Sequence, residues 1–168
     1  MRDALIIFVS LIAAIVIGGS LYLFGGPSFH YGSSKSPSGS AMVKLAEGIN
    51  ALSIDTRVNY RITNQTDLTT LWRMVYGDNG PSVPTIDFNT REVLAVFDGS
   101  HSSGGYSIHV RDVSDAGGKR TIYIVRTAPD GGCPTANAIT SPFEIVSLSK
   151  SDLPLTHVDE MGTSTCNQ

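Results

Sequence analysis

Histidines, serines and carboxylates are the side chains of this chain that could support acid–base, metal or nucleophilic chemistry. No Gly-x-Ser-x-Gly motif precedes a helix pattern, so a serine hydrolase is not indicated. The carboxylates Asp87, Glu92 and Asp98 cannot be paired from sequence alone. The histidines are scattered, and none has a partner at a metal-ligand spacing: His30, His101, His109 and His157. We therefore expect no metal, no cofactor and no catalytic residues, with an enzyme kept only as a minor alternative.

The chain has two cysteines, Cys133 and Cys166. They are not in a Cys-x-x-Cys spacing and have no cluster of His or Asp beside them, which argues against a zinc site. A disulfide between them would tie down the end of the chain and would stabilise the fold by about 2 to 4 kcal/mol. The alternative is two unrelated thiols. A disulfide would place this part of the chain in an oxidising compartment.

Two Gly-rich segments are the candidate binding loops, Gly99–Gly105 and Ala128–Ala138. Adjacent glycines permit positive φ and close approach of another backbone, which suits either a tight turn or a contact surface. Both interpretations remain open here. The residues that we expect to bind a partner, if these loops bind, are Ser103, Gly104, Gly105, Tyr106, Asp130, Gly131 and Gly132.

An uncharged apolar run, Ala4–Phe24, lies near the start of the sequence. As a helix it would span about 31 Å, close to the apolar thickness of a bilayer of about 30 Å. Cleavage by signal peptidase is the alternative, but bulky side chains occupy the place of the small residues that such a site needs. Lipoprotein maturation is excluded because no cysteine precedes Cys133. We expect an uncleaved single-pass anchor in the cell membrane, with the remainder outside the cytoplasm.

Composition divides the whole chain into three parts. Residues 1–24 form the expected anchor, residues 25–40 a linker rich in Gly, Ser and Pro, and residues 41–168 one extracytoplasmic domain of ordinary size. The formal net charge is −3, and the basic residues are scattered. Because no cationic stripe is visible, nucleic acid is not an expected partner.

One segment has the periodicity of an amphipathic helix, Gln65–Tyr76. Its apolar positions recur at helical spacing, Asn64 can cap the start, and Gly77 can end it. Trp72 lies inside the apolar stripe and is expected to anchor the core. The apolar stripe consists of Leu68, Leu71, Trp72 and Val75.

The sequence pattern of the rest of the domain predicts β structure. Short segments rich in β-branched and aromatic residues alternate with turn residues, and residues 115–118 predict a hairpin. Residues 42–54 add an irregular edge. We therefore expect an α+β, mainly β fold, a small antiparallel sheet or sandwich covered by the helix, preceded by the transmembrane helix. The expected strands are Val58–Ile62, Glu92–Phe97, Tyr106–Val113, Thr121–Arg126 and Phe143–Leu148.

Several separated motifs, in the same order, resemble the PrcB C-terminal domain family, named for a non-catalytic subunit of a bacterial surface protease complex. The resemblance covers roughly 100 residues, from Asn59 to about Val158. It rests on the pair Leu71-Trp72, Asp87-Phe88 before the strand Val93–Phe97, Gly104–Ile108, Pro129–Cys133, and Thr140–Phe143.

The resemblance implies an exported accessory module of bacteria without accepted catalytic residues. The expected function is a membrane-tethered interaction domain that stabilises or regulates an exported protease or another envelope protein. The alternative is a chagasin-like inhibitor of cysteine proteases, because Ser102–Tyr106 faintly resembles an inhibitory loop of that family. Here Ser100-His101 replaces the usual Asn-Pro before the loop, and no Arg-Pro-Trp motif occurs.

Overall fold

The computed structural model describes residues 42–165. The transmembrane prediction, residues 1–24, therefore lies outside the described residues, as do the expected linker and Cys166. Among the residues that are described, no helix is both long and apolar enough to cross a bilayer. The elements of this part are β1 (Val43–Gly48), β2 (Val58–Ile62), α2 (Gln65–Tyr76), β3 (Arg91–Phe97), β4 (Ser107–Ala116), β5 (Lys119–Pro129), β6 (Phe143–Ser149) and β7 (Leu155–Ser164).

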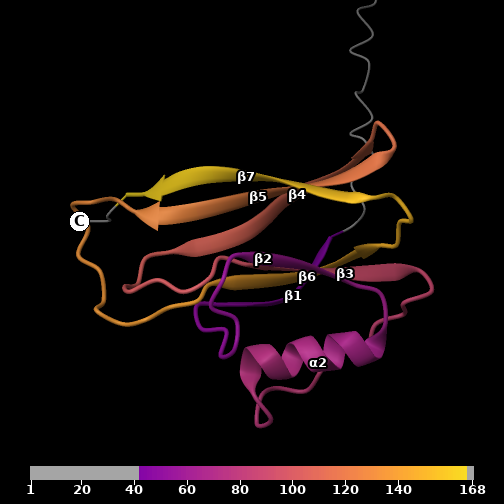
Figure 1. Cartoon of the computed structure of the whole chain (residues 1–168), viewed down its shortest axis with the longest axis horizontal. Coiled ribbons are helices and arrows are strands. Elements are labelled where there is room, and N and C mark those ends of the chain that lie inside the picture. The colour runs from indigo at the N-terminus through magenta and orange to yellow at the C-terminus, as the bar shows by residue number, and fades with distance from the viewer. Residues whose placement is uncertain (1–41, 166–168) are drawn as a thin grey trace, which may run out of the picture. The chain divides into compact units, whose positions relative to one another are not determined.

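Within residues 42–165 the strands form two sheets that stack as a sandwich (Figure 1). The larger sheet has the order β1-β6-β3-β2, and all its pairs are antiparallel. The smaller sheet has the order β4-β5-β7, in which β4 and β5 form the predicted hairpin and β7 runs parallel to β5. The expectation of a mainly β sandwich with one helix is confirmed for this part of the chain.

The larger sheet is the middle layer, because α2 covers one of its faces and the smaller sheet covers the other (Figure 1). Successive residues of a strand point to opposite faces, so β3 contributes to two cores. Val93, Ala95 and Phe97 face the helix, whereas Leu94 and Val96 face the smaller sheet. This explains why β3 is apolar without interruption from Val93 to Phe97.

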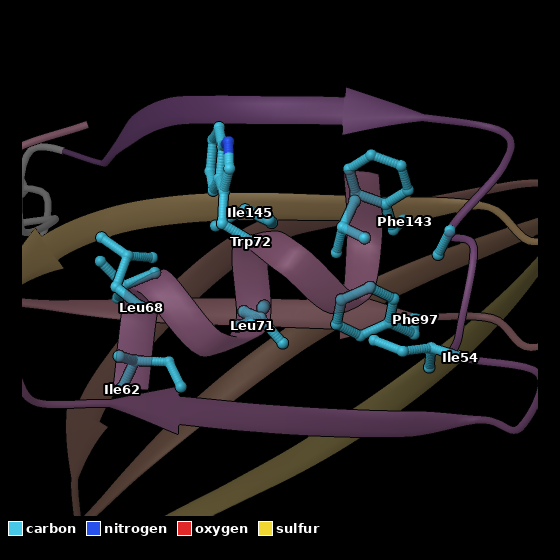
Figure 2. Packing of buried hydrophobic residues seen from close by; sticks show 12 residues of the cluster. Ile54, Ile62, Leu68, Leu71, Trp72, Phe97, Phe143 and Ile145 are labelled. Carbon is cyan, nitrogen blue, oxygen red and sulfur yellow. The ribbon is translucent and has the colours of Figure 1, made fainter. Parts of the chain in front are cut away.

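The expectation that the helix covers the sheet does not hold for β4 and β5, whose alternating buried residues are Ile108, Val110, Ile122 and Ile124. These side chains pack against the larger sheet, in a cluster with Leu94, Val96, Val146 and Leu148. The helix instead packs its predicted apolar stripe against Phe97, Phe143 and Ile145 on the opposite face of the larger sheet (Figure 2). Sequence periodicity identifies a buried face, but not which element covers it.

The helix begins and ends where its capping residues predict. The Asn64 side chain accepts a hydrogen bond from the backbone N–H of Asp67 at 2.9 Å, and Gly77 ends the helix with a φ of 73°. Trp72 is 5% exposed, and its Nε1 donates to the Pro81 carbonyl oxygen at 2.9 Å. Trp72 is thus a core anchor, as expected.

Strand β7 was not predicted from the sequence. It runs along the edge of the smaller sheet and is mostly exposed, so it lacks the alternation of apolar and polar residues that identified the other strands. Its pairing with β5 extends from Leu155 beside Arg120 to Ser164 beside Pro129.

Candidate interaction site

Three loops meet at one end of the sandwich, which we call the loop end: residues 49–57, 98–106 and 130–142. This is the left end of the molecule in Figure 1. The Ser141 N–H donates to the Ile49 carbonyl oxygen at 2.6 Å, and the His101 N–H donates to the Thr140 carbonyl oxygen at 2.8 Å. The third loop is therefore bonded by backbone groups to each of the other two.

The two Gly-rich segments that the sequence singled out contact each other directly. The Gly104 N–H donates to the Ala136 carbonyl oxygen at 2.9 Å, and the Thr140 hydroxyl donates to the Ser103 carbonyl oxygen at 2.8 Å. Gly105 has a φ of 92°, and a Cβ at this position would lie 2.9 Å from the Pro129 Cβ. Glycine is required at residue 105 so that the loops can close on each other.

The predicted binding residues differ in how accessible they are. Gly105, Asp130, Gly131 and Gly132 are exposed, whereas Ser103, Gly104 and Tyr106 are half-buried. The Tyr106 ring stacks on the His101 ring, with the centroids 3.7 Å apart and an interplanar angle of 6°. The face of Tyr106 that stacks on His101 is thus used within the protein and is not open to a partner.

A buried charge holds the second loop, residues 98–106, in place. Asp98 is 5% exposed and follows β3 directly. Its carboxylate lies 2.7 Å from the His101 Nε2 and accepts a hydrogen bond from Arg126 of β5. The Asp98 N–H donates to the Pro142 carbonyl oxygen at 2.9 Å. This network orients the His101 ring and joins the loop to both sheets, so its evident chemical effect is to position the loop.

Apolar side chains project from the loop end into solvent. Ile49 is 57% exposed, Leu52 is 68% exposed and Ile139 is 75% exposed. A hollow of about 360 Å³ includes Leu52 and Ile139 in its lining, and a second hollow of about 480 Å³ lies against Ile49, Gly104 and Gly105. Sequence analysis missed these residues, although each is a large apolar residue in a loop, outside any periodic pattern.

Cys133 lies in the third loop, close to the end of β7. Its Sγ is 3.8 Å from the Ser164 carbonyl oxygen, and the Asp130 N–H donates to the same oxygen at 3.2 Å. Cys166 follows two residues later in the sequence but lies outside the described residues. The Cys133–Cys166 disulfide therefore stays a prediction.

A group of potential metal ligands lies between β1, β4 and β6, which the sequence spacing did not predict. Oxygen and nitrogen atoms of Glu47, His109 and Glu144 lie within 4.8 Å of one another. The Lys44 Nζ lies 2.7 Å from Glu47 and 3.0 Å from Glu144, and these hydrogen bonds raise the pKa of Lys44 above its ordinary value. Because the Lys44 ammonium already pairs with both carboxylates, the arrangement acts as an ion-pair cluster.

The comparison with family models finds a match to the family described as PrcB C-terminal, over residues 93–149. The match contains β4, β5 and β6 entirely and most of β3, so it includes two of the three loops of the loop end. The Leu71-Trp72 motif lies outside it. No curated protein and no solved structure matches the chain.

The family match favours the accessory interpretation over the chagasin-like alternative. It covers the Gly-Gly-Tyr-Ser-Ile, Pro-Asp-Gly-Gly-Cys and Thr-Ser-Pro-Phe motifs on which the resemblance rested. The segment from residue 93 to residue 149 thus matches the PrcB C-terminal family, which confirms the resemblance for this part of the chain.

Proposed function

We propose that this chain is a non-enzymatic accessory domain that binds an exported protein through its loop end. The observation that carries the proposal is the exposure of Ile49, Leu52 and Ile139 at the loop end. Two of the three loops there lie within the residues that match the family. Solvent-exposed apolar side chains that gather beside hollows are typical of protein-binding surfaces. The family supports a protease complex as the setting, and the partner is an exported protease or another envelope protein.

The rigidity of the loops supports binding. Backbone bonds from Gly104 to Ala136 and from Ser141 to Ile49 fix three segments that would otherwise be long free loops. Ordering a free loop on binding costs free energy, so a loop that is already ordered binds more tightly through the same contacts. A disulfide between Cys133 and Cys166, which we include in the proposal, would add a covalent restraint to the third loop.

The proposal also includes the cellular location. The apolar run Ala4–Phe24 would anchor the chain as a single-pass helix, and the linker would let the domain reach partners near the membrane. The domain would then lie outside the cytoplasm, where a disulfide persists. Accessibility of an engineered cysteine at the exposed residue Ala116 to a membrane-impermeant thiol reagent in intact cells tests this location. Labelling only after lysis would contradict it.

The function is tested by chemical crosslinking of the full-length chain in its native membrane, followed by mass spectrometry of the captured proteins. We expect an exported protease or another envelope protein to be captured by the natural chain and lost with Ile139→Asp. The matched control is Val43→Asp on β1, because Val43 is 50% exposed but lies outside the loop end. This control should capture the same partner as the natural chain.

Two outcomes would contradict the proposal. Capture that is equal for the natural chain and the Ile139→Asp and Leu52→Asp variants would show that the loop end is not the binding surface. Recovery of cell-wall components alone would replace the accessory role with that of a structural tether.

A further inference from the structure

Strand β7 has a strand neighbour on one side only, because the smaller sheet has the order β4-β5-β7. It is ten residues long, and its sequence, LTHVDEMGTS, contains neither proline nor lysine. These are two of the residues that usually protect a sheet edge from pairing with another chain. Val158 is 43% exposed and Met161 is 68% exposed on this strand. The edge is thus long and weakly protected.

The hydrogen bonds to β5 show which backbone groups of β7 point outward. The Arg120 N–H donates to the Pro154 carbonyl oxygen, and the Asp130 N–H donates to the Ser164 carbonyl oxygen. In a parallel pair every second residue bonds to the neighbouring strand, so the even-numbered residues of β7 face β5. The outward N–H and C=O groups therefore belong to the odd-numbered residues, Leu155, His157, Asp159, Met161 and Thr163.

We propose that β7 pairs antiparallel with β7 of a second copy of this chain, around a two-fold axis beside Val158. The two smaller sheets would then form one continuous sheet of six strands. A two-fold interface of this kind is the commonest in homodimers, because each copy presents the same surface. The occupant of the open edge is thus a second copy of the chain.

The register follows from charge complementarity. With Val158 opposite Val158 of the second copy, His157 lies opposite Asp159, and this pair occurs twice by symmetry. Opposite charges across a strand pair stabilise the pairing, whereas like charges destabilise it. Centring the axis on Asp159 or on Glu160 would place two like carboxylates opposite each other, and centring it on His157 would place two imidazoles together.

The outward backbone groups exclude the intermediate registers. An axis between two residues would place an odd-numbered residue opposite an even-numbered one, whose N–H and C=O already bond to β5. Asp159 is also held in one orientation, because Arg57 binds both of its oxygens, at 2.8 and 3.0 Å, and Arg126 lies 3.8 Å away. Burial acts to raise the pKa of Asp159, but the hydrogen bond and charge of Arg57 keep that pKa below its ordinary value, so the carboxylate is charged.

Apolar contacts agree with the same register. Leu155 packs partly against the core between the sheets and would lie opposite Met161 of the second copy. A hollow of about 240 Å³ beside Leu155, also lined by Ile122 and His157, adjoins the position that this methionine would take. Because the strands are antiparallel, the two loop ends would point in opposite directions and both would remain open.

Disulfide trapping of the full chain in its native membrane tests the register. Val158 and its copy would form a non-hydrogen-bonded pair, because their backbone groups already bond to β5. In such a pair the Cα atoms lie about 4.5 Å apart, within the range that a disulfide spans. We expect Val158→Cys to form a crosslinked dimer on a non-reducing gel. Thr156→Cys is the matched control on the same face, because its two copies would lie about 13 Å apart. Coexpressed Thr156→Cys and Glu160→Cys chains should crosslink to each other.

The natural chain gives the background from Cys133 and Cys166. Absence of a Val158→Cys dimer above this background, or equal crosslinking by Thr156→Cys alone, would overturn the proposal.

Charge variants test the pairing independently. In the Val158→Cys background, His157→Glu should lower the dimer fraction about tenfold, because it places like charges opposite each other twice. His157→Lys places a positive charge opposite Asp159 and should not lower the dimer fraction. Equal crosslinking by the two variants would contradict the charge pairing and with it the register. This inference does not depend on the loop end, so it can fail while the proposed function stands.

Discussion

The two ends of the sandwich differ in how they use polar and apolar side chains. The loop end exposes Ile49, Leu52 and Ile139, whereas the opposite end, which we call the hairpin end, buries charges beneath the turn between β4 and β5. There Glu92 is 0% exposed and Arg120 is 1% exposed. Each end thus reverses the usual distribution of side chains, apolar outside at one and charged inside at the other.

The buried charges of the hairpin end are fully paired. Glu92 accepts hydrogen bonds from Arg61 at 2.7 Å and from Arg120 at 2.7 Å, and Arg120 also binds both oxygens of Asp115. These bonds connect β2 and β3 of the larger sheet to β4 and β5 of the smaller one. The comparison teaches that ion pairs join the sheets at both ends, since Arg126 binds Asp98 at the loop end as well. What distinguishes the loop end is its exposed apolar side chains, which can bind a partner while contributing little to stability.

The largest effect on stability should come from breaking the hairpin end. Arg120→Met removes a partner of a carboxylate that water does not reach, and such a loss costs about 3 kcal/mol. Chemical denaturation of the variant should show this decrease in the free energy of unfolding. The control is Arg111→Ala, which removes an exposed ion pair with Glu160 and should cost less than about 1 kcal/mol. Equal losses would show that the hairpin end has no special role.

Within the loop end, two glycines should differ. Gly105→Ala should destabilise the fold by about 1 to 3 kcal/mol, because residue 105 has positive φ and its new Cβ would meet Pro129. Gly132→Ala should change stability by less than about 0.5 kcal/mol, because nothing lies within 4 Å of a Cβ there. Thermal unfolding of both variants measures the difference. If the two melt together, the close contact between the Gly-rich loops is not a constraint on the fold.

The same difference decides which of Gly104, Gly105 and Gly132 can be replaced by a bulky residue to test binding without harm to the fold. Gly105 cannot be used in this way, because its substitution strains the backbone itself. A Cβ added at Gly104 would lie 3.5 Å from the Ala136 Cβ, which is an ordinary contact, and one added at Gly132 would have nothing within 4 Å. Loss of binding in Gly132→Trp would therefore report on the surface rather than on folding.

A smaller effect is expected from acid. The hydrogen bonds from Arg120 hold the pKa of Asp115 below its ordinary value of 3.8. A carboxylate with a lowered pKa in the folded state contributes stability above its unfolded pKa, and this contribution is lost as the pH falls through the folded pKa. We expect the melting temperature of the natural chain to fall more than that of Asp115→Asn between about pH 5 and pH 2. Parallel curves would mean that Asp115 adds no acid-sensitive stability.

The smallest effect on stability is expected at the exposed apolar residues. Ile139→Asp and Leu52→Asp should each change the free energy of unfolding by less than about 0.5 kcal/mol, because their side chains are already mostly in water. Denaturation of the purified variants checks this. A loss of more than about 2 kcal/mol would show that these side chains belong to the fold and are not available for a partner.

Local patterns predicted the elements well where one rule dominates. The helix bounds follow from a capping Asn64, an apolar stripe and Gly77, all of which act within a few residues, and the hairpin follows from the Gly117-Gly118 turn, whose φ values are 59° and 72°. Strand β7 escaped because an exposed edge strand needs no apolar alternation. Its place is set by pairing with β5, which is a distant contact.

The site was predicted only in part for the same reason. The Gly-rich segments were recognised from composition, but their contact with each other depends on how β4, β5 and β6 are arranged. The apolar residues of the loop end come from three separate segments, and only the fold brings Leu52 and Ile139 to one hollow. The ion pairs of Glu92 were invisible for an equivalent reason, because Arg61 and Arg120 belong to different sheets.

The central claim, that the loop end and not the hairpin end contacts a partner, can be tested directly by site-specific photocrosslinking in the native membrane. A photoreactive residue would replace Ile139 in one full-length variant and Ala116 in another, since both positions are exposed and lie at opposite ends. We predict a discrete crosslinked partner from position 139 and none from position 116. A partner captured from position 116, with none from position 139, would contradict the account.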